Sequence, residues 1–398
     1  MRPFRVGTIR GIELRVDPSW IFVFLILTWS LGATFGTWHP QWGFGTSLTL
    51  GAVASLCFFA SVVLHELAHC VAAKAFGIEV RDITLHLFGG LASIEGSPAS
   101  PRQELAIAIV GPAVSFLVAF GAALVGTVVH AATSGQGMPA LGGYAELGPV
   151  STILLWLATA NFVVAVFNLL PGLPLDGGRV LRALLWSATG DPRVATRGAA
   201  VSGQVIGYGL ILAGIVMILG ARLPLLGQGL GAGAWTAFVG WFLKGASRES
   251  LRVALLEETL DGVHVRDLMR TRGPWVTDRM TVADLVRDVF VRGEDAVPVF
   301  EGSTFVGLVR LADVLRIGED RRALTLTRDA MTKRAELATT TPDEPAILAL
   351  RKMSGGSEIV VLGRDGVTLA GMLLSADVAR WVELHRAARE KPRRSILV

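Results

Sequence analysis

Charged residues are distributed very unevenly along this chain. Residues 16–243 contain only 8 Lys or Arg and 9 Asp or Glu, whereas residues 244–398 contain 25 and 23. So long a stretch with so few charges is typical of a membrane domain, because charged side chains are costly in the interior of a bilayer. We therefore expect a membrane domain over residues 1–245, a soluble domain over residues 246–390 and a basic tail at 391–398. The net charge of +4 gives no reason to expect direct binding to nucleic acid.

Six apolar stretches are long enough to cross a bilayer, which takes about 20 residues per helix. They lie near residues 19–36, 47–75, 104–131, 149–170, 201–220 and 228–244. Lys and Arg gather before the first stretch, in alternate connections and again after the sixth stretch. By the positive-inside rule, this pattern places the N-terminus and the soluble domain in the cytosol. The sequence thus predicts a multi-pass protein of a bacterial cell membrane.

The second apolar stretch contains a cluster of ionisable residues, His65-Glu66-Leu67-Ala68-His69. Positions i and i+4 lie on the same face of a helix, so both imidazoles can bind one metal ion. Glu66 can then act as the general base that takes a proton from the attacking water. A polar helix face that only packs against another helix is the alternative, but ionisable groups within a membrane helix usually serve a function. His65 precedes the cytosolic end of its span by about ten residues, or ~15 Å, so the site should open towards the cytosol.

A catalytic zinc ion usually has three protein ligands and keeps one position for water. Four acidic residues could supply the third ligand: Glu79, Glu95, Glu104 and Asp176. Asp176 is favoured because it follows residues 168–175, a Pro- and Gly-rich segment at the end of the fourth stretch. This segment lies on the same side of the membrane as the histidines, and a broken helix is tolerated at membrane depth where it lines a cavity. Taken alone, such a segment is also typical of a simple turn.

The histidine motif together with residues 168–177 resembles the site-2 protease family of intramembrane zinc metalloproteases, peptidase family M50, over about residues 15–245. The resemblance implies one Zn²⁺ per chain, held by His65, His69 and Asp176. It also implies that Glu66 activates water and that Asn168 steadies the scissile peptide or the oxyanion. Gly111-Pro112 in the third stretch matches the family too, although close helix packing is a sufficient explanation. The implied partner is a membrane-protein substrate such as an anti-sigma factor or a transcription-factor precursor.

A short hairpin is expected between the second and third apolar stretches. Residues 83–94 contain two β-type runs on either side of Gly89-Gly90. In the site-2 protease family, the matching segment forms a sheet in the membrane near the active site, whose free edge could bind an unwound substrate as an added strand. A hairpin that only packs against the helices is the alternative. His86 is interpreted as an incidental polar residue of this hairpin.

The soluble domain contains two related halves, at about residues 260–320 and 325–385. Each half is expected to form a strand, a helix, two strands and a helix, which resembles a tandem pair of CBS domains. That resemblance implies a dimer contact through the sheets and an adenine nucleotide bound near Asp313 or Asp377. In the family, Thr or Ser stands three residues before this aspartate. The two positions hold Arg310 and Leu374 here, so a structural module without a ligand is the alternative.

Together these features predict a polytopic α-helical membrane protein with a small membrane-associated β hairpin and a cytosolic α/β tandem CBS domain. The favoured function is an intramembrane zinc endopeptidase that cuts a transmembrane or membrane-proximal segment, with the CBS pair as a regulatory module. The alternative is a CBS-gated transporter or channel for metal ions. Transporters often show inverted repeats and charges spread over several spans, and neither is evident in this sequence. An inactive scaffold is disfavoured because a complete set of ligand and acid–base residues is present.

Overall fold

The computed structural model describes residues 3–86, 89–95, 98–135, 144–223, 227–353 and 357–389. The predicted basic tail at 391–398 lies outside these described residues. The chain divides into two compact units, the membrane unit (residues 1–252) and the soluble unit (residues 253–398).

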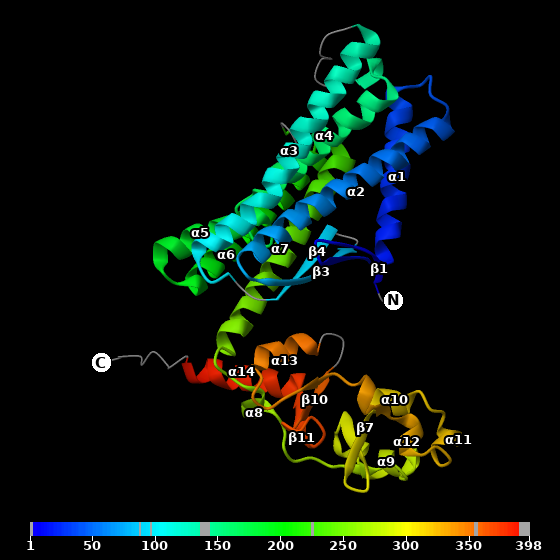
Figure 1. Ribbon diagram of the computed structural model, residues 1–398, viewed down its shortest axis with the longest axis vertical. Coiled ribbons are helices and arrows are strands. Elements are labelled where there is room, and N and C mark those ends of the chain that lie inside the picture. Colours follow the sequence, from blue (N-terminus) through cyan, green and yellow to red (C-terminus); the bar gives the residue numbers. More distant parts are fainter. Residues whose placement is uncertain are drawn as a thin grey trace. The chain divides into compact units, whose positions relative to one another are not determined.

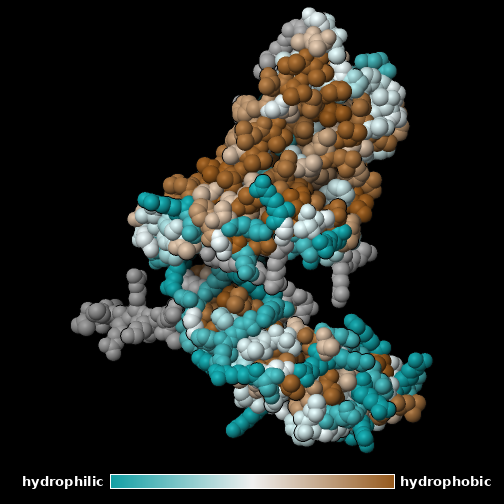
Figure 2. Space-filling view, viewed as in Figure 1, coloured by the Kyte–Doolittle hydropathy of each residue, from teal (hydrophilic) through white to brown (hydrophobic). Residues whose placement is uncertain are grey.

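Five helices of the membrane unit are long and apolar enough to cross a membrane (Figure 1). They are α1 (Ser19–Trp38), α2 (Phe44–Ala75), α3 (Pro101–Ser134), α4 (Pro149–Asn168) and α6 (Pro192–Ile218). The sixth predicted stretch forms the first part of α7 (Gly229–Thr259), which is rich in glycine there and carries charged residues further on. Figure 2 shows hydrophobic side chains over the outer surface of these helices, as expected for helices surrounded by lipid.

The helices begin, end and meet at positions that the local sequence explains. Ser100 caps α3 by accepting a hydrogen bond from the backbone N–H of Gln103, and Gly135 ends this helix with φ of 68°. Small residues allow α1 and α2 to approach closely. A Cβ atom on Gly51 would lie 2.7 Å from the backbone nitrogen of Gly32. Helix α2 packs against both α3 and α4, so the predicted metal-binding helix lies at the centre of this group.

A four-stranded sheet of order β1-β2-β3-β4 belongs to the membrane unit. Its strands are β1 (Phe4–Ile9), β2 (Ile12–Val16), β3 (Glu79–His86) and β4 (Gly89–Glu95). The predicted hairpin is formed by β3 and β4, in which Ile83 lies opposite Ala92; residues 87–88 lie outside the described part. The β1–β2 hairpin was not predicted, and it turns at Arg10 and Gly11 with φ of 50° and 76°.

One helix in the loop region between α4 and α6 was also missed by the sequence analysis. This is α5 (Asp176–Thr189), and Asp176 is its first residue. A carboxylate in the first turn of a helix interacts favourably with the helix dipole, which explains why the helix starts here. The sequence interpretation treated residues 171–200 as a connection because the Pro- and Gly-rich residues before Asp176 masked the helical pattern that follows.

The soluble unit contains two sheets, one of order β5-β6-β7-β8 and one of order β11-β10-β9. The strands are β5 (Val276–Thr277), β6 (Ala296–Glu301), β7 (Thr304–Arg310), β8 (Thr332–Lys333), β9 (Thr339–Thr340), β10 (Glu358–Leu362) and β11 (Leu369–Leu374). The helices are α8 (Val265–Leu268), α9 (Val282–Asp288), α10 (Leu311–Leu315), α11 (Glu319–Arg322), α12 (Thr327–Ala330), α13 (Ala346–Lys352) and α14 (Ser375–Arg389).

The first residues of each repeat of the soluble unit pack into the hydrophobic core of the other repeat. In repeat one, α8 buries Val265 in a cluster with Ile359 and Leu373 of repeat two. In return, Met331 at the start of repeat two packs against the core of repeat one around Val299. The sequence halves are therefore interleaved in space, and neither core is complete without the other half.

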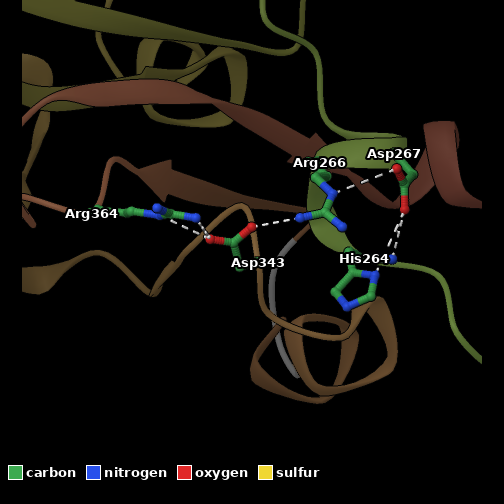
Figure 3. Close-up of polar contacts among 5 residues, drawn as sticks. All are labelled: His264, Arg266, Asp267, Asp343 and Arg364. Atoms are coloured by element: carbon green, nitrogen blue, oxygen red, sulfur yellow. Dashed lines mark hydrogen bonds and ion pairs between the residues drawn. The ribbon is translucent and has the colours of Figure 1, made fainter.

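Figure 3 shows the polar contacts that join the start of repeat one to a loop of repeat two. Asp343 accepts hydrogen bonds from Arg266 at 2.6 Å and from Arg364 at 2.8 Å. Asp267 accepts a hydrogen bond from the backbone N–H of His264 at 2.9 Å, which caps α8. All five side chains are exposed to solvent to a large degree, so each contact stabilises the fold only slightly.

Candidate functional site

Three potential metal ligands converge in the membrane unit. His65 and His69 lie one turn apart on α2, and Asp176 begins α5. Asp176 Oδ2 is 3.0 Å from His65 Nε2 and 3.2 Å from His69 Nε2, and the two Nε2 atoms are 3.2 Å apart. Zinc binds such atoms at about 2.0–2.2 Å in tetrahedral geometry, which separates neighbouring ligands by about 3.3 Å. The triangle of donor atoms therefore has the size that one zinc ion requires.

Helix α3 holds both imidazole rings by their other nitrogen atoms. His69 Nδ1 is 2.7 Å from the carbonyl oxygen of Ile107, so this nitrogen carries the proton and donates it. His65 Nδ1 is 2.9 Å from Ser115 Oγ. A metal-binding histidine typically donates its distal N–H to such a partner, which leaves the Nε2 lone pair free for the metal. Both rings are buried, so this orientation is fixed by packing as well as by hydrogen bonds.

Gly111 faces the donor atoms from α3. A Cβ atom at this position would lie 2.2 Å from His69 Nε2 and 2.7 Å from His65 Nε2. Any other residue would therefore displace the imidazoles, so the glycine creates the space in which the donors meet. From the sequence, Gly111 was explained only by helix packing, and Ile107 and Ser115 were not predicted. Their four-residue spacing, which places all three on one face of α3, is the signal that could have revealed them.

The two other predicted catalytic residues lie on α2 and at the end of α4. Glu66 follows His65 on α2, is half-buried and lies within electrostatic range of both imidazoles and of Asp176. Asn168 is the last residue of α4 and is also half-buried. The structure thus brings His65, His69 and Asp176 into one cluster, with Glu66 beside it.

The rival candidates for the third ligand have other surroundings. Glu104 on α3 is buried and forms an ion pair with Arg182 of α5 at 3.1 Å. Glu79 is exposed on β3, and the side chain of Glu95 lies outside the described part. Of the candidates whose side chains are described, Asp176 is the one that lies against the histidines.

The loop that leads to Asp176 is fastened to two neighbouring helices. Ser202 of α6 donates a hydrogen bond to the carbonyl of Pro171, and Ser247 of α7 donates one to the carbonyl of Leu173. Gly172 packs so closely that a Cβ atom there would lie 2.4 Å from the Cα atom of Gly203. These contacts satisfy the backbone groups freed by the broken helix, and they fix the position from which Asp176 points to α2.

In the soluble unit, arginines contact both aspartates that the sequence analysis proposed for nucleotide binding. Asp377 accepts two hydrogen bonds from Arg270, at 2.6 and 2.7 Å. Asp313 lies 3.8 Å from the guanidinium groups of Arg310 and Arg316. A cleft of about 220 Å³ opens beside Arg270. Its lining also includes Arg272, Trp275, Phe300, Met372 and Leu374.

Comparisons with known proteins agree with this arrangement. A profile of the family described as Peptidase family M50 matches residues 53–214, and one described as CBS domain matches residues 265–320. The chain is 32% identical over 391 residues to "Putative zinc metalloprotease Rip3" of Mycobacterium tuberculosis, covering 97% of this chain and 94% of that protein. It is 36% identical over 287 residues to "Putative zinc metalloprotease sll0528" of Synechocystis, covering 72% and 70%. A solved structure, "Site-2 Protease from Methanocaldococcus jannaschii", is 25% identical with a TM-score of 0.40 and covers 63% of this chain and 95% of that one.

The apolar helices and these relatives define the protein as a zinc metalloprotease of the multi-pass membrane class. More closely, the chain belongs to peptidase family M50, the site-2 protease family, and it carries a CBS domain in its soluble unit. This membership supports the protease interpretation over the transporter alternative.

Proposed function

We propose that this protein is an intramembrane endopeptidase that hydrolyses a peptide bond in a transmembrane or membrane-proximal segment of a protein substrate. One Zn²⁺ per chain would be held by His65, His69 and Asp176. The observation that carries the proposal is the buried triangle of three donor atoms with sides of 3.0–3.2 Å. The three side chains already converge in the structure.

The residues around the triangle would divide the work of hydrolysis. When bound, zinc supplies Lewis-acid chemistry that activates water and polarises a carbonyl oxygen. Glu66 takes a proton from the attacking water and later gives the same proton to the leaving amine nitrogen, so no second acid is needed. The amide group of Asn168 can donate a hydrogen bond to the scissile carbonyl. Burial of the site limits the access of bulk water to the reaction.

The sheet of the membrane unit offers a way to present the substrate. A transmembrane helix must unwind before cleavage, because its carbonyl groups are already hydrogen-bonded. In the sheet order of the described strands, β4 is an edge strand, and an extended segment can add to such an edge. The sheet packs on the metal-binding helix, since Ile83 of β3 shares a buried cluster with Cys70 and Ala73 of α2. A substrate strand on β4 would thus lie beside the helix that bears the histidines.

The charge pattern and the family suggest the cellular setting. We propose that the N-terminus and the soluble unit face the cytosol and that the substrate is a membrane-anchored regulator such as an anti-sigma factor or a transcription-factor precursor. The soluble unit would act as a regulatory module and as a dimer contact.

A single substitution tests the proposed mechanism. Full-length Glu66→Gln should retain one zinc ion per chain but lose cleavage of a transmembrane reporter in detergent by at least about 10²-fold, because the general base is absent. Glu79→Gln makes the same chemical change at an exposed position on β3 and should leave cleavage unchanged. Full activity of Glu66→Gln would rule out the proposed role of this residue.

A second function is favoured by the cleft in the soluble unit. We propose that it binds an adenine nucleotide, because Trp275 and Phe300 offer aromatic surfaces for a base and Arg270 and Arg272 offer positive charge for phosphate. Asp377 would contact the ribose once Arg270 turns to the phosphate. Titration of the full-length protein with AMP and ATP by calorimetry tests this proposal, and Trp275→Ala should weaken the binding.

A further inference from the structure

The two repeats of the soluble unit correspond residue by residue along their central strands. In repeat one, β6 pairs antiparallel with β7, and Ala296 lies opposite Arg310. In repeat two, β10 pairs antiparallel with β11, and Glu358 lies opposite Leu374. Ala296 therefore corresponds to Glu358, and Arg310 corresponds to Leu374. Each pair of corresponding positions combines a charged residue with an apolar one, so the two clefts between the repeats cannot be chemically alike.

The first cleft lies where β6 of repeat one faces β11 of repeat two. Ala296 and Leu374 belong to the same apolar cluster there, and both line the cleft of about 220 Å³. Arg270 lies beside them, because its backbone N–H and carbonyl bond to those of Met372 at 2.7 and 3.0 Å. Because Ala296 is small and Leu374 carries no charge that could pair with it, the space between them stays open.

The second cleft lies where β7 of repeat one faces β10 of repeat two. Arg310 donates a hydrogen bond to the carboxylate of Glu358 and another to Thr332 Oγ1 at 2.9 Å. Thr332 pairs with Leu308 across the sheet, and Arg270 forms the same kind of β-bridge with Met372 in the first cleft. Thr332 therefore corresponds to Arg270. The ion pair thus occupies the place that is open in the first cleft.

Apolar side chains fill the remainder of the second cleft. In the segment leading into repeat two, Leu337 packs against a buried cluster that contains Phe305 and Val360. In the corresponding segment of repeat one, Trp275 is 63% exposed at the edge of the open cleft. Among the residues that the structure describes, the second cleft is therefore occupied by the chain's own side chains.

The two arginine–carboxylate pairs differ in how easily a ligand could replace them. Glu358 is 6% exposed, and removing the guanidinium partner of a buried carboxylate is strongly destabilising. In the pair of Arg270 and Asp377, the carboxylate side chain is 14% exposed and the arginine side chain 41%, against 2% and 32% in the pair of Glu358 and Arg310. A phosphate group can compete for Arg270, whereas Arg310 is held in place by the charge that it neutralises.

We infer that the soluble unit binds one anionic ligand with a planar ring per chain, in the cleft beside Arg270, and that the Arg310–Glu358 pair permanently closes the second cleft. This inference rests on the nucleotide binding proposed above and adds its stoichiometry and the reason why the second cleft stays closed. The internal ion pair takes the place of a ligand in holding the two repeats together on the closed side.

The test exchanges the residues of the two clefts and counts the bound AMP. Calorimetry of the full-length protein in detergent should give one AMP per chain. The fourfold variant Arg310→Leu, Glu358→Ala, Thr332→Arg and Leu337→Trp, which copies the open cleft onto the closed one, should bind a second AMP. The reverse variant, Ala296→Glu with Leu374→Arg, should bind none. Leu374→Arg alone tests the position of the open cleft if either multiple variant fails to fold, and it should reduce binding at least tenfold.

The possible outcomes separate this inference from nucleotide binding itself. Two AMP molecules per wild-type chain, or a Leu374→Arg variant that binds as well as wild type, would overturn the single-cleft inference and leave nucleotide binding in place. A folded fourfold variant that still binds one AMP would also overturn it. If neither AMP nor ATP binds the wild type or the opened variant, nucleotide binding fails, and the inference fails with it.

Discussion

The membrane unit and the soluble unit place buried carboxylates in opposite surroundings. In the membrane unit, Asp176 shares a centre with the Nε2 atoms of His65 and His69. In the soluble unit, Glu358 lies against the guanidinium of Arg310. A carboxylate beside a guanidinium is already neutralised, whereas a carboxylate that meets two nitrogen donors forms a set suited to a divalent cation. Convergence of donor atoms, more than burial of charge, thus distinguishes the proposed metal site from a structural ion pair.

Removal of the membrane carboxylate should produce the largest effect. We expect Asp176→Ala to lose most of its zinc, with a fall in metal affinity that exceeds the ~10–100-fold loss typical when only a residue supporting a ligand is removed. Zinc content by mass spectrometry and cleavage of a transmembrane reporter are the measurements. Glu79→Ala, on an exposed part of β3, is the matched control. Unchanged zinc stoichiometry in Asp176→Ala would remove this residue from the metal site.

A methyl group added at Gly111, which faces the donor atoms from α3, should reduce zinc binding almost as strongly. The Cβ atom of Gly111→Ala would lie 2.2 Å from His69 Nε2, so the imidazole must move and the donor triangle must open. We expect zinc affinity and cleavage to fall by about 10²-fold. Gly121→Ala lies on the same helix with nothing within 4 Å of its Cβ, and it should keep zinc and activity. Equal behaviour of the two variants would contradict the role of Gly111.

The sequence predicted which residues would supply the donor atoms of the proposed membrane site, but it did not predict the groups that support them. His65 and His69 follow from helix periodicity, and the topology of the spans favoured Asp176. The carbonyl of Ile107 and the hydroxyl of Ser115 could not be predicted, because their roles depend on how α3 packs against α2. The fold class predicted from the sequence, with several membrane helices, a hairpin and a CBS module, is confirmed.

Other elements escaped prediction for separate physical reasons. Strand β1 is short and mostly exposed, so it depends on pairing with β2 more than on a pattern of its own. In the soluble unit, the repeat was visible in the sequence, but the facing of Arg310 and Glu358 was not. That contact joins β7 to β10 across the interleaved repeats, which only the tertiary fold brings together.

The membrane unit also contains a buried carboxylate that is paired with an arginine, Glu104 with Arg182. Glu104 is buried and pairs with Arg182, so Glu104→Ala leaves a partly buried arginine without its partner. We expect destabilisation near the lower end of the ~3–5 kcal/mol typical of broken buried pairs, because Arg182 is partly exposed. The double variant Glu104→Leu with Arg182→Leu should be less destabilised. Thermal unfolding in detergent measures both, and a single variant as stable as the double would show that the pair is not electrostatically coupled.

The smallest effect is expected at the exposed network of the soluble unit. The guanidinium of Arg364, and after it that of Arg266, holds the pKa of the Asp343 carboxyl below its ordinary value (Figure 3). A carboxyl whose pKa is lowered by folding stabilises the protein at pH values above its unfolded pKa, and this contribution is lost as the pH falls through the folded pKa. Asp343→Asn should therefore lower the melting temperature slightly at pH 7 and not at all in strong acid, as followed by thermal unfolding. Glu319→Gln, at another exposed carboxylate of this unit that lies 3.9 Å from the guanidinium of Arg322, is the matched control for the removal of one surface charge. Because solvent screens every charge in this network, its removal should leave both zinc content and cleavage unchanged, in contrast to removal of Asp176.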